Sequence, residues 1–122
     1  ELLDETLVTY PIDPKRVYIM GISMGAIATL DMVYRFPDTF DKAVSICGAT
    51  NIERMREFKG KTKFRFYHGD IDDVIPVTYS REAYEALKST GKKVEYIEFY
   101  GANHNAWHPA FNTKDFLEWS FK

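Results

Sequence analysis

Four short runs of apolar residues recur along the chain, at residues 17–22, 43–47, 64–67 and 94–100. Each run has the length of a β-strand. The run at 43–47 has the apolar character that is typical of strands covered on both faces of a parallel sheet. We therefore predict that these four segments are the strands of one parallel sheet.

Between these runs, apolar residues return at helical spacing, which predicts helices near residues 24–34, 52–58 and 77–89. The same spacing predicts a helix within residues 1–10 and a last helix that begins at Asn112 or Thr113. Strands that alternate with helices predict an α/β fold with three layers, in which a parallel sheet carries helices on both faces.

A serine stands between the first strand and the first long helix, in the motif Gly21-x-Ser23-x-Gly25. A strand, a sharp turn with serine at its tip and a helix form the nucleophile elbow of serine hydrolases. We expect a strained backbone at Ser23, and we expect side chains at positions 21 and 25 to collide with neighbouring backbone. Ser23 is the candidate nucleophile, and the backbone N–H of Met24 is the candidate oxyanion-hole donor.

Composition narrows the partners and the chemistry. The chain has 122 residues, 45% of them hydrophobic, which is enough for one core. The net charge is −2 with both signs interspersed, a pattern that argues against a nucleic-acid partner. No run of apolar residues has the length of a membrane span. Cys47 is the single cysteine, which excludes an internal disulfide. It lies in an apolar run, which predicts a buried thiol.

A serine nucleophile needs a base and a carboxylate that orients the base. Candidates follow the third and fourth strands, whose carboxyl ends share one edge of a parallel sheet. Asp70, Asp72 and Asp73 follow the third strand, and His104 and His108 follow the fourth. The chain order of serine, acid and histidine is the order of the α/β-hydrolases.

The three histidines of the chain have alternative roles, as metal ligands or as structural residues. His104 and His108 have the spacing of a metal-binding pair on a helix, but Pro109 and the neighbouring glycine and asparagines indicate a loop. The glutamate of the HExxH motif is also missing from this stretch. We therefore expect no metal and no cofactor. His68 ends the third strand, and we expect it to bond to the loop that carries Asp72.

Five stretches together resemble a known family. They are Arg16-Val17-Tyr18-Ile19-Met20-Gly21-Ile22-Ser23-Met24-Gly25, Arg35-Phe36-Pro37-Asp38, Ile46-Cys47-Gly48, His68-Gly69-x-x-Asp72-x-x-Ile75-Pro76 and Gly101-x-x-His104-Asn105-x-Trp107. The chain resembles the C-terminal half of an α/β-hydrolase. Within that fold it is similar to bacterial esterases of the phospholipase/carboxylesterase and prolyl-oligopeptidase types, which are related to polyhydroxybutyrate depolymerases and feruloyl esterases.

The resemblance implies roles for particular residues. Asp72 matches the acid of the family's HGxxD motif, and His104 matches its base. Asp70 and Asp73 are then loop carboxylates or turn caps, and Asp73 stands where the family often has proline. For Trp107 two roles stay open, packing against the histidine loop and lining the substrate site.

These observations lead to the expectation of a serine hydrolase that cleaves small carboxylic esters through an acyl-enzyme. The alternatives are a peptidase of the same fold and a non-catalytic, hydrolase-like module that binds a partner through its open sheet edge. The fold has about eight strands and a second oxyanion donor in its first half. We expect residues 1–122 to form a single partial domain, whose sheet is completed by the rest of a longer protein or by another chain.

Overall fold

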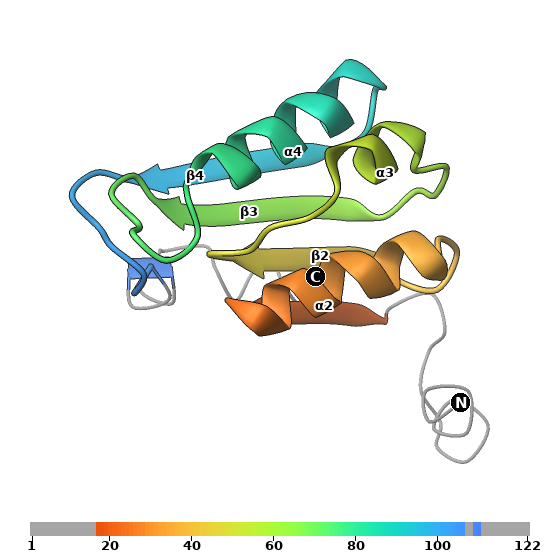
Figure 1. The fold of residues 1–122 in the computed structure, drawn as a ribbon. Coiled ribbons are helices and arrows are strands. Elements are labelled where there is room, and N and C mark those ends of the chain that lie inside the picture. Colours follow the sequence, from red (N-terminus) through yellow and green to blue (C-terminus); the bar gives the residue numbers. More distant parts are fainter. Residues whose placement is uncertain (1–16, 107–108, 111–122) are drawn as a thin grey trace, which may run out of the picture.

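A computed structural model describes residues 17–106 and 109–110 of the chain. Its centre is a four-stranded sheet in the order β1-β2-β3-β4, and every neighbouring pair is parallel. The strands are Tyr18–Ile22 (β1), Lys42–Ile46 (β2), Lys63–Gly69 (β3) and Val94–Phe99 (β4). Figure 1 shows that the strands all point in one direction, so the loops after them meet at one edge.

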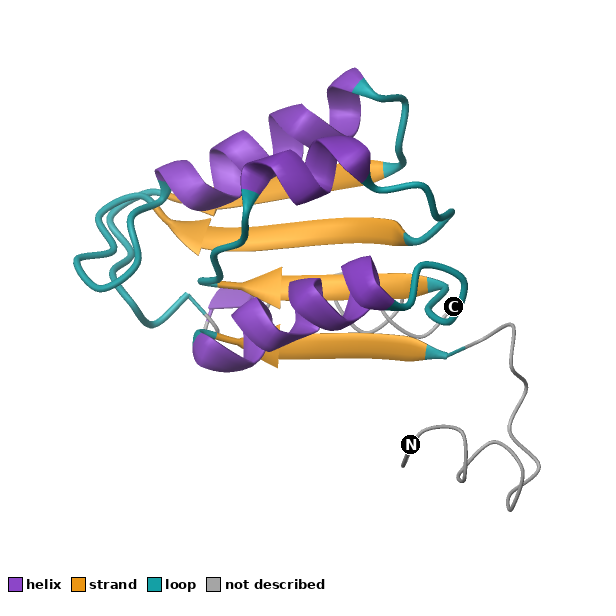
Figure 2. Cartoon of the chain, turned by 45° about the vertical axis from the view of Figure 1, so that its right-hand side comes forward, coloured by secondary structure: helices purple, strands orange, loops and turns teal. Residues whose placement is uncertain are grey.

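Three helices connect the strands and lie on one face of the sheet (Figures 1 and 2). They are α2 (Met24–Arg35), α3 (Ile52–Glu57) and α4 (Thr78–Ser89). The side chain of Asn51 caps α3 by accepting a hydrogen bond from the backbone N–H of Glu53. Gly91, with φ of 78°, follows α4, in the left-handed conformation that commonly ends helices.

The main core lies between these helices and the sheet. Leu30 and Val33 of α2, Met55 of α3 and Leu87 of α4 pack there against strand residues such as Phe64. Along β2 and β3, side chains alternate between the two faces of the sheet. The opposite face therefore carries a second buried cluster, which consists of Val44, Ile46, Cys47, Tyr67, Ala106 and Ala110.

The four strands and three helices that the apolar pattern predicts between residues 17 and 100 are confirmed. The buried face of α2 is not made of its large apolar residues alone. Ala26 and Thr29 are buried, whereas Ile27 is 40% exposed. The helices predicted within residues 1–10 and from Asn112 or Thr113 lie outside the described residues. Among the described helices, none has the length and apolar character required to cross a membrane.

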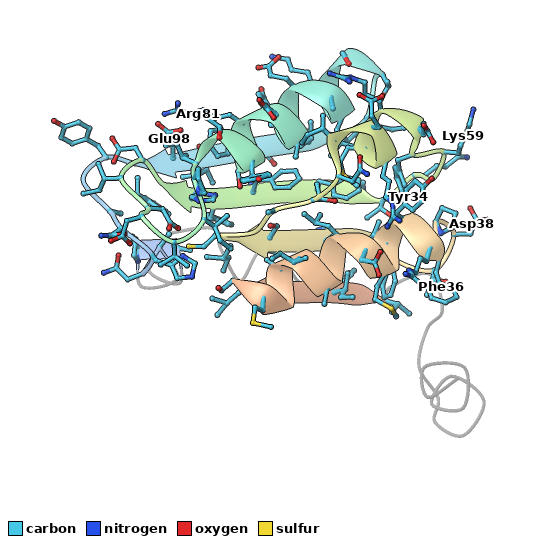
Figure 3. All side chains as sticks on the ribbon, in the orientation of Figure 1. Tyr34, Phe36, Asp38, Lys59, Arg81 and Glu98 are labelled. Atoms are coloured by element: carbon cyan, nitrogen blue, oxygen red, sulfur yellow. The ribbon has the colours of Figure 1, made fainter. Side chains whose placement is uncertain are left out.

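A charged pair joins α4 to β4 on the exposed side of the fold, where Figure 3 labels Arg81 and Glu98. The guanidinium of Arg81 donates two hydrogen bonds of 2.7 Å to the carboxylate of Glu98. The hydroxyl of Tyr96 donates a further bond to the same carboxylate. Chiefly because of the bonds from Arg81, the pKa of Glu98 is lowered to about 2.

Candidate active site

Ser23 occupies a strained turn between β1 and α2. Its φ of 58° and ψ of −117° lie in a region that residues with side chains rarely adopt. The turn is held in place because the backbone N–H of Ser23 donates to the carbonyl of Ile46 at 2.8 Å. The strain expected from the sequence is therefore present.

The two glycines of the motif differ in what they do. A Cβ added to Gly21 would lie 2.1 Å from the carbonyl oxygen of Gly25, so position 21 has no room for a side chain. At Gly25 the expectation of a collision was wrong. A Cβ there would have no described atom within 4 Å, apart from its chain neighbours and the backbone of its own helix, because Gly25 lies on the exposed side of the first turn of α2.

His104 lies in the loop after β4 and reaches the serine. Its Nε2 is 2.7 Å from the Oγ of Ser23, and its Nδ1 is 2.8 Å from the Oδ2 of Asp72. An ionised carboxylate can only accept hydrogen bonds, so Nδ1 carries the proton. In that tautomer Nε2 is the acceptor that faces the hydroxyl of Ser23.

Asp72 lies in the loop after β3, and its side chain is fully buried. Its Oδ1 accepts the backbone N–H groups of Val74 at 2.9 Å and Ile75 at 2.8 Å. Burial by itself would raise the pKa of Asp72. The hydrogen bonds from His104 and from the two backbone groups outweigh burial, so the pKa lies below its ordinary value. Asp72 is therefore an anion that points at His104.

Hydrogen bonds tie the aspartate loop to the histidine loop. The side chain of Asn103 accepts the backbone N–H groups of Asp73 at 2.9 Å and His104 at 2.8 Å. Asp70 accepts the N–H of Gly101 at 2.7 Å, so this carboxylate links the two loops. A side chain at Gly69 would lie 2.2 Å from the carbonyl oxygen of Ala102. The two loops are therefore held in close and fixed contact.

Asn103 is a residue that the sequence reading missed. The only signal available was an asparagine directly before the candidate base, and its bond to Asp73 bridges 30 positions of the chain. The side chain of Asp73 is exposed, and it is the backbone N–H of Asp73 that donates to Asn103.

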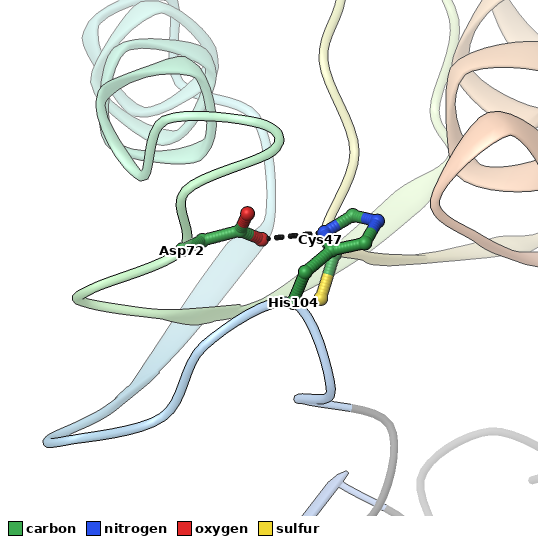
Figure 4. A group of neighbouring side chains, drawn as sticks. All are labelled: Cys47, Asp72 and His104. Carbon is green, nitrogen blue, oxygen red and sulfur yellow. Dashed lines mark hydrogen bonds and ion pairs between the residues drawn. The ribbon is translucent and has the colours of Figure 1, made fainter.

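Cys47 lies beside the aspartate and the histidine (Figure 4). One ligand-type atom from each of these three residues falls within 4.8 Å of the others, a grouping that could suggest a metal site. Burial raises the pKa of the Cys47 thiol to about 11, so the free thiol keeps its proton at neutral pH. Nδ1 of His104 is already bonded to Asp72. The arrangement fits a buried packing thiol, as the sequence indicated.

An open, apolar depression of about 510 Å³ adjoins these loops. Its lining contains no charged side chain. The lining residues are Ile27, Ala49, Thr50, Asn51, Val74, Ile75, Pro76 and Tyr79. Ile27 lies one helical turn after Ser23, and Val74 and Ile75 bind Asp72, so this apolar groove adjoins the segments that carry the serine and the aspartate.

The remaining residues that the sequence singles out are Met24, Trp107 and His108. Met24 opens α2, where the first backbone N–H groups have no acceptor within the helix, and its side chain is 80% exposed. Trp107 and His108 lie outside the described residues.

The described sheet and helices match proteins of the α/β-hydrolase fold. The crystal structure of a thermostable esterase superposes with a TM-score of 0.92 at 30% identity, over 98% of this chain. The crystal structure of esterase PE8 superposes with a TM-score of 0.76 at 24% identity, also over 98% of this chain. The fold is therefore that of the α/β-hydrolases.

The sequence comparison is more specific. The model of the phospholipase/carboxylesterase family matches residues 1–120, and this chain belongs to that family. Poly(3-hydroxyalkanoate) depolymerase C of Paucimonas lemoignei is 40% identical over 48 residues, which cover 39% of this chain. The chain spans 34% of the thermostable esterase, 54% of esterase PE8 and 12% of the depolymerase.

Proposed function

We propose that this protein hydrolyses carboxylic esters through an acyl-enzyme formed on Ser23. The observation that carries the proposal is the chain of contacts from Ser23 through His104 to Asp72, with distances of 2.7 and 2.8 Å. A hydroxyl, an imidazole and a buried carboxylate in this order form the arrangement by which serine hydrolases activate their nucleophile.

In the proposed reaction, the Oγ of Ser23 attacks the ester carbonyl carbon while the Nε2 of His104 takes its proton. Asp72 holds the ring in the required tautomer and stabilises its cation. His104 then protonates the leaving alcohol. Water attacks the acyl-serine with His104 again as base, which releases the acid and restores the serine. No step requires a metal or an organic cofactor.

The negative charge of the tetrahedral intermediate needs hydrogen-bond donors. We assign one of them to the backbone N–H of Met24, at the N-terminus of α2, where the helix dipole favours an anion. A second donor is expected from a segment beyond the described sheet, because β1 is the outer strand of that sheet. We propose that a further strand pairs with β1, either from the rest of the protein or from another chain.

The apolar groove supports a substrate with an uncharged hydrocarbon group next to the ester. A charged group would lose hydration against this lining without gaining an ionic partner. We therefore propose simple alkyl or aryl esters as substrates, with the hydrocarbon group seated against Ile27, Val74 and Tyr79.

The test is hydrolysis of p-nitrophenyl acetate by the full-length protein, with Ser23→Ala as the matched variant. We expect the natural protein to release p-nitrophenol and the variant to lose nearly all of this activity. If a folded natural protein shows no hydrolysis above buffer, or if Ser23→Ala retains the rate, the proposal is wrong. The first of these results would favour the non-catalytic, partner-binding alternative.

A further inference from the structure

A second imidazole, that of His68, touches the carboxylate of Asp72 from inside the fold. His68 lies near the carboxyl end of β3, four residues before Asp72, and its side chain has no exposed surface. Its Nε2 is 2.7 Å from the carbonyl oxygen of Ile75 and 3.3 Å from the Oδ2 of Asp72. Its Nδ1 is 2.7 Å from the hydroxyl of Ser80, a buried residue of α4.

These contacts define one protonation state of His68. The carbonyl oxygen of Ile75 can only accept, so the Nε2 of His68 must carry a proton. Burial lowers the pKa of His68 although Ile75 and Asp72 act against it, so the ring is neutral and its Nδ1 is unprotonated. The hydroxyl of Ser80 therefore donates to Nδ1, which fixes the orientation of the ring.

The Oδ2 of Asp72 accepts the Nδ1–H of His104 and lies 3.3 Å from the Nε2 of His68, whose single proton bonds the carbonyl of Ile75. The Oδ1 of Asp72 faces two N–H donors, from Val74 and Ile75. A carboxylate with donors on both oxygens has little freedom to rotate. His68 also bonds the carbonyl of Ile75, so one ring holds both the aspartate and the loop behind it.

We propose that His68 is a positioning residue, which holds the Asp72 carboxylate in the plane that His104 requires. Ser80 acts through His68 by fixing its tautomer. This inference rests on the proposed esterase function. It goes beyond that function because it makes turnover depend on a side chain that has no access to substrate.

Two substitutions of similar size separate positioning from packing. In His68→Gln the amide nitrogen can replace the Nε2–H donor, whereas in His68→Asn the amide oxygen can replace only the acceptor that faces Ser80. We expect His68→Asn to lower kcat for p-nitrophenyl acetate about tenfold at unchanged KM, because it loses the bond to the Ile75 carbonyl and the polar contact with the Asp72 carboxylate. We expect His68→Gln to stay within about threefold of the natural protein.

Ser80→Ala tests the positioning role of His68 independently. It also covers the case in which His68→Asn does not fold. It leaves His68 in place and removes only the donor to Nδ1. We expect kcat to fall about threefold or more at unchanged KM, with the fold retained by circular dichroism.

The outcomes separate the two proposals. If the natural protein lacks esterase activity, the proposed function fails and this inference fails with it. If the natural protein is active but His68→Asn and His68→Gln lose equal activity, His68 only fills space and the inference alone is wrong. An unchanged kcat in folded Ser80→Ala also overturns the inference.

Discussion

Replacing Asp72 with asparagine changes one oxygen to an NH2 group at almost constant size. The Oδ1 of the new side chain can keep its bonds from Val74 and Ile75. The amide nitrogen then stands in the place of Oδ2, where it faces the Nδ1–H of His104 at a site built for an acceptor. Two donors cannot bond to each other, so the His104 ring is driven to the tautomer with its proton on Nε2.

That tautomer cannot accept a proton from Ser23, because the Nε2 that faces the serine is already protonated. The negative charge that stabilises the imidazolium is lost as well. The same substitution in serine proteases lowers kcat about 10⁴-fold, and we expect a loss of this size here. It corresponds to about 5 kcal/mol of transition-state stabilisation.

The assay is kcat/KM for p-nitrophenyl acetate, measured on full-length Asp72→Asn with Asp73→Asn as the matched control. Asp73 is the next residue, but its side chain is exposed, so we expect the control to stay within about twofold of the natural protein. A folded Asp72→Asn that keeps more than about one tenth of the natural rate would refute the reasoning. A comparable loss in Asp73→Asn would show that the wrong carboxylate was assigned.

Further predictions concern the turn, the groove and pH. Gly21→Ala should lower the free energy of unfolding by about 3 kcal/mol in urea titrations, because its Cβ would overlap backbone. Gly25→Ala should raise it by up to about 1 kcal/mol, and equal effects of the two would contradict the assigned geometry. Ile27→Gln should lower the kcat/KM ratio of p-nitrophenyl hexanoate to acetate about threefold, whereas Tyr100→Gln, 97% exposed and outside the groove, should not. Because the folded-state pKa of Glu98 is lowered to about 2, its stabilising effect is complete above its ordinary pKa and lost as pH falls toward 2. The stability difference between the natural protein and Glu98→Gln should shrink over that range, and a constant difference would be contrary to the prediction.

The strands and helices between residues 17 and 100 could be predicted because their signals are local. Short, largely apolar runs marked the strands, and apolar residues at helical spacing marked the helices between them. The position of the candidate site was also accessible from sequence. Carboxyl ends of parallel strands share one edge, and Ser23, Asp72 and His104 all follow strands.

The features that sequence reasoning could not supply depend on contacts between distant segments. Nothing in the spacing indicates that Ser80 faces His68 or that Asn103 bonds to Asp73, because these bonds follow from how α4 and the loops pack. The buried thiol of Cys47 was predictable from its apolar neighbours, but its place beside His104 was not. Gly25 shows the opposite error, in which a motif suggested a steric need that the described structure lacks.

The central claim, a nucleophilic serine activated by His104, is tested most directly by covalent labelling. The full-length protein would be treated with a fluorophosphonate probe, digested and mapped by mass spectrometry. The account predicts one stoichiometric adduct on the peptide that carries Ser23, and loss of that adduct when His104 is replaced by alanine. A folded, unlabelled protein, or an adduct at another residue, would contradict it.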